Sequence, residues 1–259
     1  MAAGRSGVPR ALLWDVDGTL ADTEPHGHLP AYNLAFAELG LPWRWDDDSY
    51  RRWLSVSGGR ERLTAFLEAV EGRPPSPCLV DNLFAAKQRH YAAILREGHL
   101  PLRPGVAALI AESADAGIPQ AVVTTSSRQA VAALIEGLPG SLASAFGFWV
   151  CGEDVAAKKP DPEAYRQALD RLGGDDPPAA MLAIEDSPHG LAAATGAGLP
   201  CLVTVAAWGV PAADGAFDGA RAVVEALAED QGSVRVRRGP PCPGGQVTLA
   251  YLGGLLESP

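Results

Sequence analysis

Hydrophobic residues follow two different rhythms along this chain. A short apolar run at residues 11–14 comes first, and a longer block follows in which apolar residues recur every three or four positions. Leu63, Phe66 and Leu67 show this spacing, which is typical of an amphipathic helix. The block has no run that is typical of a strand, so the pattern predicts an all-helical segment over residues 22–100.

After this block, helical and strand-like segments alternate. The predicted helices cover residues 31–39, 50–54, 61–71, 82–97, 107–116, 127–136, 161–172 and 191–197, and the predicted strands cover residues 11–14, 118–124, 147–150, 180–184 and 201–205. Alternating strands and helices of these lengths predict an α/β fold, with a Rossmann-like parallel sheet between helices on both faces.

Prolines and glycines mark the borders between these parts. Two prolines stand at the start of the helical block, and residues 101–105 stand at its end. We therefore expect a core domain made of residues 1–21 and 101–229, with a helical domain, residues 22–100, inserted into it. Residues 230–259 are predicted as a linker and a C-terminal extension, whose last apolar segment fits either a strand or a helix.

The composition narrows the classes of partner. With 259 residues, of which 47% are hydrophobic, the chain can bury an ordinary globular core. A formal net charge of -10 argues against a nucleic-acid partner and against an anionic membrane surface. A phosphorylated small molecule stays open as a partner, since a metal ion and a few basic side chains can reverse the field inside a cleft.

The cysteines and the lengths of the apolar runs indicate in which cellular compartment the protein is expected. The four cysteines stand far apart and form no C-x-x-C pair, which argues against zinc and fits a reducing compartment. No apolar run reaches the length of about 18 residues that crosses a membrane, and the N-terminus lacks the apolar core of a signal peptide. These features predict a protein of the cytoplasm or the plastid stroma, and we expect it to be a monomer.

Two acidic residues end the first predicted strand. Asp15 and Asp17 lie two positions apart, so on a strand they point to the same face, and Gly18 lets the backbone turn sharply after them. In an open α/β sheet, ligands bind at the carboxyl ends of the strands. Two convergent carboxylates there favour a hard cation such as Mg²⁺. The alternative is an ordinary Asp-Gly turn.

Polar groups also stand at later junctions of this kind. Thr125 and Ser126 lie between a strand and a helix, where hydroxyl and free backbone N–H groups suit an anion, although Ser126 or Ser127 also fits a helix cap. Lys159 comes directly before a Pro-Asp-Pro sequence, and Glu185 and Asp186 follow an apolar strand. Each of these residues, when it is taken singly, also fits a helix cap or a solvated surface position. Two acidic pairs, a hydroxyl group and a lysine at the strand ends of one sheet predict one shared site.

This ordered set of motifs resembles a known family. Asp-x-Asp-Gly-Thr at Asp15, a Thr after an apolar strand, Lys-Pro-x-Pro at Lys159 and Glu-Asp-Ser at Glu185 look like the four motifs of the haloacid dehalogenase superfamily of phosphatases. The resemblance spans about residues 11–205 and is greatest with the CbbY-type sugar-phosphate phosphatases, which act on xylulose 1,5-bisphosphate. It implies that the helical insertion is a cap that closes over the site.

The resemblance also implies roles for the residues of the motifs. Asp15 is the nucleophile that takes up the phosphoryl group, and Asp17 is the general acid and base. The implied Mg²⁺ ligands are Asp15, the backbone carbonyl of Asp17, Glu185 and Asp186. The implied phosphate-binding residues are Thr125, Ser126 and Lys159.

Most of the implied substrate-binding residues lie in the cap. Ser57 to Arg62 resembles the specificity loop of the cap, in which glycines permit close approach and an arginine grips a second phosphate. The implied substrate contacts are Glu24, His28, Gly58, Gly59, Arg60, Lys87, Arg103 and Arg128. Each of the charged residues also fits a solvated surface position when it is taken singly.

The start of the cap departs from the family pattern. The segment from Pro25 to Pro30 is one residue longer than in relatives, so either His26 or His28 faces the substrate, and Pro30 shifts the start of the helix. Gly27 stands where relatives carry a bulkier residue.

The sequence therefore predicts a Mg²⁺-dependent phosphatase of a small sugar phosphate, above all of a bisphosphate such as xylulose 1,5-bisphosphate. One alternative is a β-phosphoglucomutase, which shares the site but returns the phosphate to the sugar. Another is a non-enzymatic module that binds a phosphorylated ligand. Glu24 directly after Thr23 resembles the phosphatase group, and no motif residue is missing, as one would be in a binding module.

Overall fold

The centre of the molecule is a mixed sheet. The computed structural model describes residues 7–56, 58–97, 100–206, 208, 213, 215–229 and 232–257. Within these residues the strand order is β3-β2-β1-β4-β5-β6-β7, and all neighbouring strands are parallel except β6 and β7. The strands are β1 (Leu12–Trp14), β2 (Gln120–Val123), β3 (Phe146–Val150), β4 (Leu182–Glu185), β5 (Cys201–Thr204), β6 (Ala222–Val224) and β7 (Val236–Arg238).

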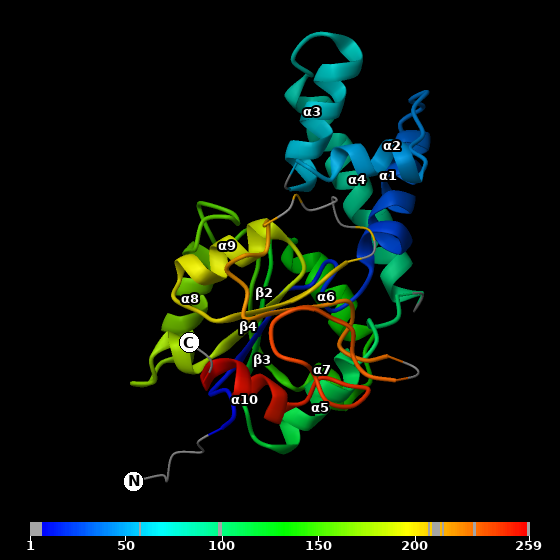
Figure 1. Cartoon of the computed structure of the whole chain (residues 1–259). Helices are drawn as coiled ribbons and strands as arrows, with labels where there is room; N and C mark the ends of the chain where they lie inside the picture. Colours follow the sequence, from blue (N-terminus) through cyan, green and yellow to red (C-terminus); the bar gives the residue numbers. More distant parts are fainter. Residues whose placement is uncertain are drawn as a thin grey trace.

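Helices cover both faces of this sheet (Figure 1). Leu12 and Trp14 are fully buried on one face, and Leu13 is fully buried on the other, because side chains alternate along a strand. The first face carries α5 (Val106–Asp115), α6 (Arg128–Glu136), α7 (Gly140–Ala143) and α10 (Leu249–Glu257). The second face carries α8 (Glu163–Leu172) and α9 (Pro188–Gly196), and a short 3₁₀ helix, η2 (Pro178–Ala180), precedes β4.

The chain between β1 and α5 forms a separate group of helices above the sheet (Figure 1). It consists of a π-helix, η1 (Glu24–His28), followed by α1 (Leu29–Glu38), α2 (Asp47–Trp53), α3 (Gly59–Glu71) and α4 (Pro77–Arg96). Aromatic rings fill its interior, with the centroid of Trp45 5.1 Å from that of Phe36 and 4.8 Å from that of Phe66. Ala92 and Leu95, near the end of α4, are buried in the core domain, so α4 packs against both domains.

The α/β fold that the alternation predicted is confirmed. The largest shift of a helix end is at α4, which begins at Pro77, because proline suits the first turn of a helix. The strands β6 and β7 were not predicted. The sequence of β7 is Val-Arg-Arg and the strand lies at the edge of the sheet, so no apolar run marks it. β7 and α10 lie in the segment predicted as a linker and extension, and both pack onto the core, with Leu252 and Leu255 fully buried. None of the described helices is both long and apolar enough to cross a membrane.

Candidate active site

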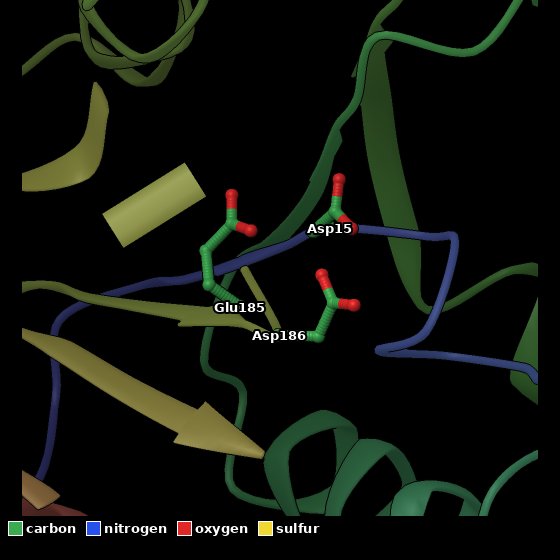
Figure 2. Close-up of side chains that lie close together, drawn as sticks. All are labelled: Asp15, Glu185 and Asp186. Atoms are coloured by element: carbon green, nitrogen blue, oxygen red, sulfur yellow. The ribbon is translucent and has the colours of Figure 1, made fainter. Parts of the chain in front are cut away.

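Three carboxylates converge at one edge of the sheet. Asp15 follows β1, Glu185 ends the neighbouring strand β4, and Asp186 comes next. One oxygen atom of each lies within 4.8 Å of those of the other two. Figure 2 shows the three carboxylates pointing to the same side. Residues far apart in the sequence meet here because β1 and β4 are adjacent and parallel.

Lys159 places a positive charge inside this cluster. Its ammonium group donates to Glu185 Oε1 at 2.6 Å, to Asp15 Oδ1 at 2.8 Å and to the carbonyl oxygen of Val123 at 2.8 Å. Burial lowers the pKa of Lys159, but the two carboxylates outweigh burial, so the pKa lies above its ordinary value. The lysine is therefore charged at neutral pH.

The electrostatics of the carboxylates fit a cation. Burial raises the pKa of Asp15 to about 7, with the charges of Glu185 and Asp17 adding to the rise and Lys159 opposing it. Burial and the charges of Asp15 and Glu185 hold the pKa of Asp186 well above its usual range. Glu185 Oε2 is buried and has no hydrogen-bond partner among the described residues. A divalent cation relieves both the repulsion and the unpaired oxygen, and hard carboxylate oxygens are the ligands that Mg²⁺ prefers.

A fourth acid, Asp17, faces the same cavity. Its Oδ1 accepts a hydrogen bond from the Thr23 hydroxyl at 2.5 Å and lies 3.1 Å from His28 Nε2, while its Oδ2 accepts one from the Ser126 hydroxyl. Burial raises the pKa of Asp17, but the charge of His28 and the hydrogen bonds outweigh burial and hold the pKa well below its usual range. Asp17 is therefore an ionised acceptor whose orientation three donors fix.

The loop between β2 and α6 brings Thr125 and Ser126 to the cavity. The side chain of Ser127, not that of Ser126, caps α6 by accepting a hydrogen bond from the N–H group of Ala130 at 3.3 Å. Ser126 is thus left to bond Asp17, and the capping alternative applies to its neighbour.

A cavity of about 760 Å³ lies between the core and the helical domain. On the side of the helical domain, Lys87 is buried in the wall of this cavity. Its Nζ atom lies 2.8 Å from His28 Nδ1 and donates a hydrogen bond to Gln88 Oε1 at 3.1 Å. Burial lowers the pKa of Lys87 to about 8. The His28 ring stacks on Tyr91 with the ring centroids 4.2 Å apart. The volume suits a small phosphorylated ligand.

Arg62, the last residue of the predicted specificity loop, was not among the predicted substrate contacts, yet it is a second buried cation in the wall of this cavity. Its Nη1 atom donates to the Tyr50 hydroxyl at 2.7 Å and lies 3.5 Å from Glu24 Oε2, which also accepts the Tyr50 hydroxyl. The signal was present in the sequence, because Arg62 stands four residues before Phe66 and therefore on the apolar face of α3.

The predicted specificity loop reaches the cavity in part. Gly58 and Gly59 line it, and Gly58 has a φ of +90°, a conformation that favours glycine. Arg60 also lines the cavity, but its guanidinium group bonds Asp81 on α4. Ser57 lies outside the described residues.

Comparison with known proteins identifies the family. Residues 9–198 match the family model of the haloacid dehalogenase-like hydrolases, a span that contains both acidic clusters and the helical insertion. The chain belongs to the haloacid dehalogenase-like hydrolases. The resemblance inferred from the four motifs is confirmed.

Several members of this hydrolase family are similar over most of their length. The plasmid-encoded protein CbbY of Cupriavidus necator is 43% identical over 228 residues, which cover 85% of this chain and 86% of that protein. A crystal structure of a CbbY variant from Rhodobacter sphaeroides in complex with xylulose-(1,5)bisphosphate has a TM-score of 0.74 and 41% identity, and the match covers 84% of this chain and 94% of that one. Phosphoglycolate phosphatase of Rhodospirillum rubrum is 33% identical over 254 residues, which cover 97% and 100% of the two chains. The predicted placement among the phosphatases of this family is confirmed.

In this hydrolase the segment from Glu24 to His28 forms the π-helical turn η1, and Pro30 lies in the first turn of α1 directly after it. A Cβ atom at Gly27 would lie 2.6 Å from Tyr91 Cε2, so only glycine fits where η1 approaches α4. The turn leaves His26 exposed and buries His28 in the cavity wall. The geometry therefore selects His28 of the two candidate histidines.

Two residues of the predicted substrate set lie away from the cavity. Arg103 is buried, and its guanidinium group donates to the backbone carbonyls of Gly18 and, at 2.7 Å, Val205. Arg128 lies at the surface and donates to Asp154 at 2.5 Å. Neither is among the described residues that line the cavity. Their positions favour structural roles over substrate contact.

Proposed function

We propose that this hydrolase is a Mg²⁺-dependent phosphatase of a small sugar phosphate that works through an aspartyl-phosphate on Asp15. The observation that carries this proposal is the convergence of Asp15 with Glu185, Asp186 and Lys159. Burying several charges costs free energy that core packing does not return. Buried titratable groups with shifted pKa values in a cavity are typical of active sites.

In this proposal the carboxylate of Asp15 attacks the phosphorus atom, and a new O–P bond forms as the bond between phosphorus and the sugar oxygen breaks. Asp17 gives a proton to the leaving sugar oxygen. It then takes a proton from the water molecule that attacks the aspartyl-phosphate and releases inorganic phosphate. The negative charge of a bound phosphate raises the pKa of Asp17, which favours the protonated form that the first transfer needs.

The other core residues bind the phosphate. Lys159 remains charged beside the transferring group and offsets its negative charge. Thr125 and Ser126 offer donors at the start of α6. The cation would be held by Asp15, the backbone carbonyl of Asp17, Glu185 and Asp186. When it is bound there, Mg²⁺ makes the phosphorus atom more electrophilic.

Basic side chains on the cap side of the cavity support a second phosphate on the substrate. Lys87 and Arg62 are buried there, and Arg60 also lines the cavity, as does Lys158 from the core domain, which pairs with Glu61 of α3. In a chain with a net charge of -10, this concentration of cations suits a ligand with a second anionic group. The CbbY of R. sphaeroides, similar over most of its length, was crystallised with xylulose-(1,5)bisphosphate. We therefore propose a sugar bisphosphate of the xylulose 1,5-bisphosphate type as the substrate.

Replacement of the nucleophile tests the chemistry. The wild-type enzyme should release phosphate from a sugar phosphate only with Mg²⁺, and Asp15→Asn should lower the rate by about 10³-fold or more, because an amide oxygen is a poor nucleophile. Asp170→Asn, at an exposed acid on α8, is the matched control and should retain the activity. Equal phosphate release by wild type and Asp15→Asn would refute the mechanism.

A panel of phosphorylated sugars tests the substrate. Ketose bisphosphates should have the highest kcat/KM, and a large margin in favour of phosphoglycolate would contradict the proposed second phosphate site. Isomerisation of β-glucose 1-phosphate with a bisphosphate primer and without free phosphate would identify a mutase instead. Binding of bisphosphates without any turnover would identify a binding module.

A further inference from the structure

A tyrosine beneath the acidic cluster plays no part in the chemistry described above. Tyr165, on α8, is fully buried, and its hydroxyl donates to Glu185 Oε1 at 2.5 Å. The ammonium group of Lys159 donates to the same oxygen at 2.6 Å and lies 5.1 Å from the centre of the Tyr165 ring. The ring and the hydroxyl of Tyr165 thus contact both a carboxylate of the cluster and its lysine.

The two oxygens of Glu185 are treated differently by their surroundings. Oε1 accepts two hydrogen bonds, whereas Oε2 is buried and has no partner among the described residues. A Cβ atom at Gly190 would lie 1.8 Å from Oε2, so the glycine leaves room for this oxygen. Two donors on one oxygen fix the rotation of the carboxylate and leave the remaining lone pairs of the group for a cation.

Of the two donors, Tyr165 is the dedicated one. Lys159 divides its hydrogen bonds among Glu185, Asp15 and the carbonyl oxygen of Val123, and a bound phosphate would compete with these three acceptors for its ammonium group. The Tyr165 hydroxyl keeps Glu185 in place during such a change. It is also a neutral donor, since a tyrosine hydroxyl ordinarily titrates only at about pH 10. A neutral donor orients a carboxylate without cancelling the negative charge that attracts a cation.

We propose that Tyr165 is a positioning residue for the cation site: its hydroxyl holds the carboxylate of Glu185 in the orientation that binds Mg²⁺. This inference rests on the proposed function, which assigns Glu185 to the cation. Tyr165 does not touch the substrate or the cation. It acts through Glu185.

The test is Tyr165→Phe, which removes the hydroxyl and leaves the ring in place. Mg²⁺ is titrated into the substrate-free protein, and its dissociation constant is measured by calorimetry. We expect Mg²⁺ to bind about tenfold more weakly to Tyr165→Phe than to wild type, the loss that is typical when a hydrogen-bond partner of a metal ligand is removed. Excess Mg²⁺ should restore kcat, while KM for the sugar phosphate stays near the wild-type value.

Tyr251→Phe is the matched control, because this hydroxyl on α10 donates to the carbonyl oxygen of Pro240 at 2.9 Å, away from the site. It should leave the Mg²⁺ affinity unchanged. If Tyr165→Phe lowers the melting temperature but binds Mg²⁺ as wild type does, or binds it more tightly, Tyr165 only packs the core and the inference is overturned. If the wild-type protein itself binds no Mg²⁺, the proposed function fails as well, so the two failures are distinguishable.

Discussion

Raising the pH from 7 to 9 should weaken the action of the enzyme on a bisphosphate through Lys87. This lysine is 4% exposed and lies on the cap side of the cavity, where burial lowers its pKa to about 8. A lysine with an ordinary pKa keeps its charge over this range. Lys87 should lose its charge and with it the attraction for the second phosphate.

The size of the effect follows from the pKa. With a value of about 8, Lys87 is roughly 90% charged at pH 7 and about 10% charged at pH 9. Since kcat/KM follows the ionisation of the free enzyme, kcat/KM for the bisphosphate should fall by about tenfold through Lys87 alone. A charge-assisted hydrogen bond of about 1.5–3 kcal/mol is large enough to allow this loss.

The assay compares a bisphosphate with the monophosphate of the same sugar at each pH. The ratio of the two kcat/KM values cancels the ionisation of Asp15 and Asp17, which both reactions share. The ratio should fall by about tenfold between pH 7 and pH 9 in wild type. In Lys87→Met it should be low at pH 7 and constant over the range.

The lowered pKa of Lys87 also predicts how the free energy of unfolding changes with pH. The pKa of Lys87 in the folded protein lies below the ordinary value of 10.5, so the charged form destabilises the fold. That penalty is fully present below pH 8 and disappears as the pH rises toward 10.5. Wild type should therefore gain stability relative to Lys87→Met over this range, measured by urea denaturation. A constant kcat/KM ratio in wild type, or an unchanged ratio in Lys87→Met, would refute the role assigned to Lys87.

Three further substitutions test the rest of the site. Lys159→Met should lower the free energy of unfolding by about 3–5 kcal/mol in the presence of a chelator, because it leaves buried carboxylates unpaired. Added Mg²⁺ should recover part of this loss in a urea titration. An unchanged free energy of unfolding would contradict the charge balance of Lys159 and the carboxylates. Gly18→Ala should destabilise the protein by about 1–3 kcal/mol and weaken Mg²⁺ binding in calorimetry. The reasons are that Gly18 has a φ of +83° and that a Cβ atom there would lie 2.2 Å from Asp186 Oδ2. If the variant binds Mg²⁺ with the wild-type affinity, Asp186 can move aside. Arg103→Gln should lower the free energy of unfolding by about 1–3 kcal/mol with KM unchanged, because it leaves buried carbonyl groups unpaired; a higher KM without loss of stability would return Arg103 to the substrate-binding residues.

The sequence by itself determined the fold class and indicated which residues converge at the carboxyl ends of the strands. Hydrophobic periodicity reports which side of each element is buried, and alternating elements of these lengths fit a parallel sheet between helices. The carboxyl ends of parallel strands lie at the same edge of a sheet. Because Asp15 and Glu185 each stand at the end of a predicted strand, the sequence was enough to predict that they lie in one site. The edge strand β7, with the sequence Val-Arg-Arg, has no apolar run by which it could be found in this way.

Only the tertiary structure decided where the long side chains point. Arg60, Arg103 and Arg128 were all predicted as substrate contacts. In the structure Arg60 lines the cavity, Arg103 donates to backbone carbonyls and Arg128 lies at the surface. The choice between His26 and His28 likewise depends on how the π-helical turn packs against Tyr91. A flexible side chain takes the direction of the partners that packing brings near it, and those partners come from other elements. Periodicity along one element contains no information about them.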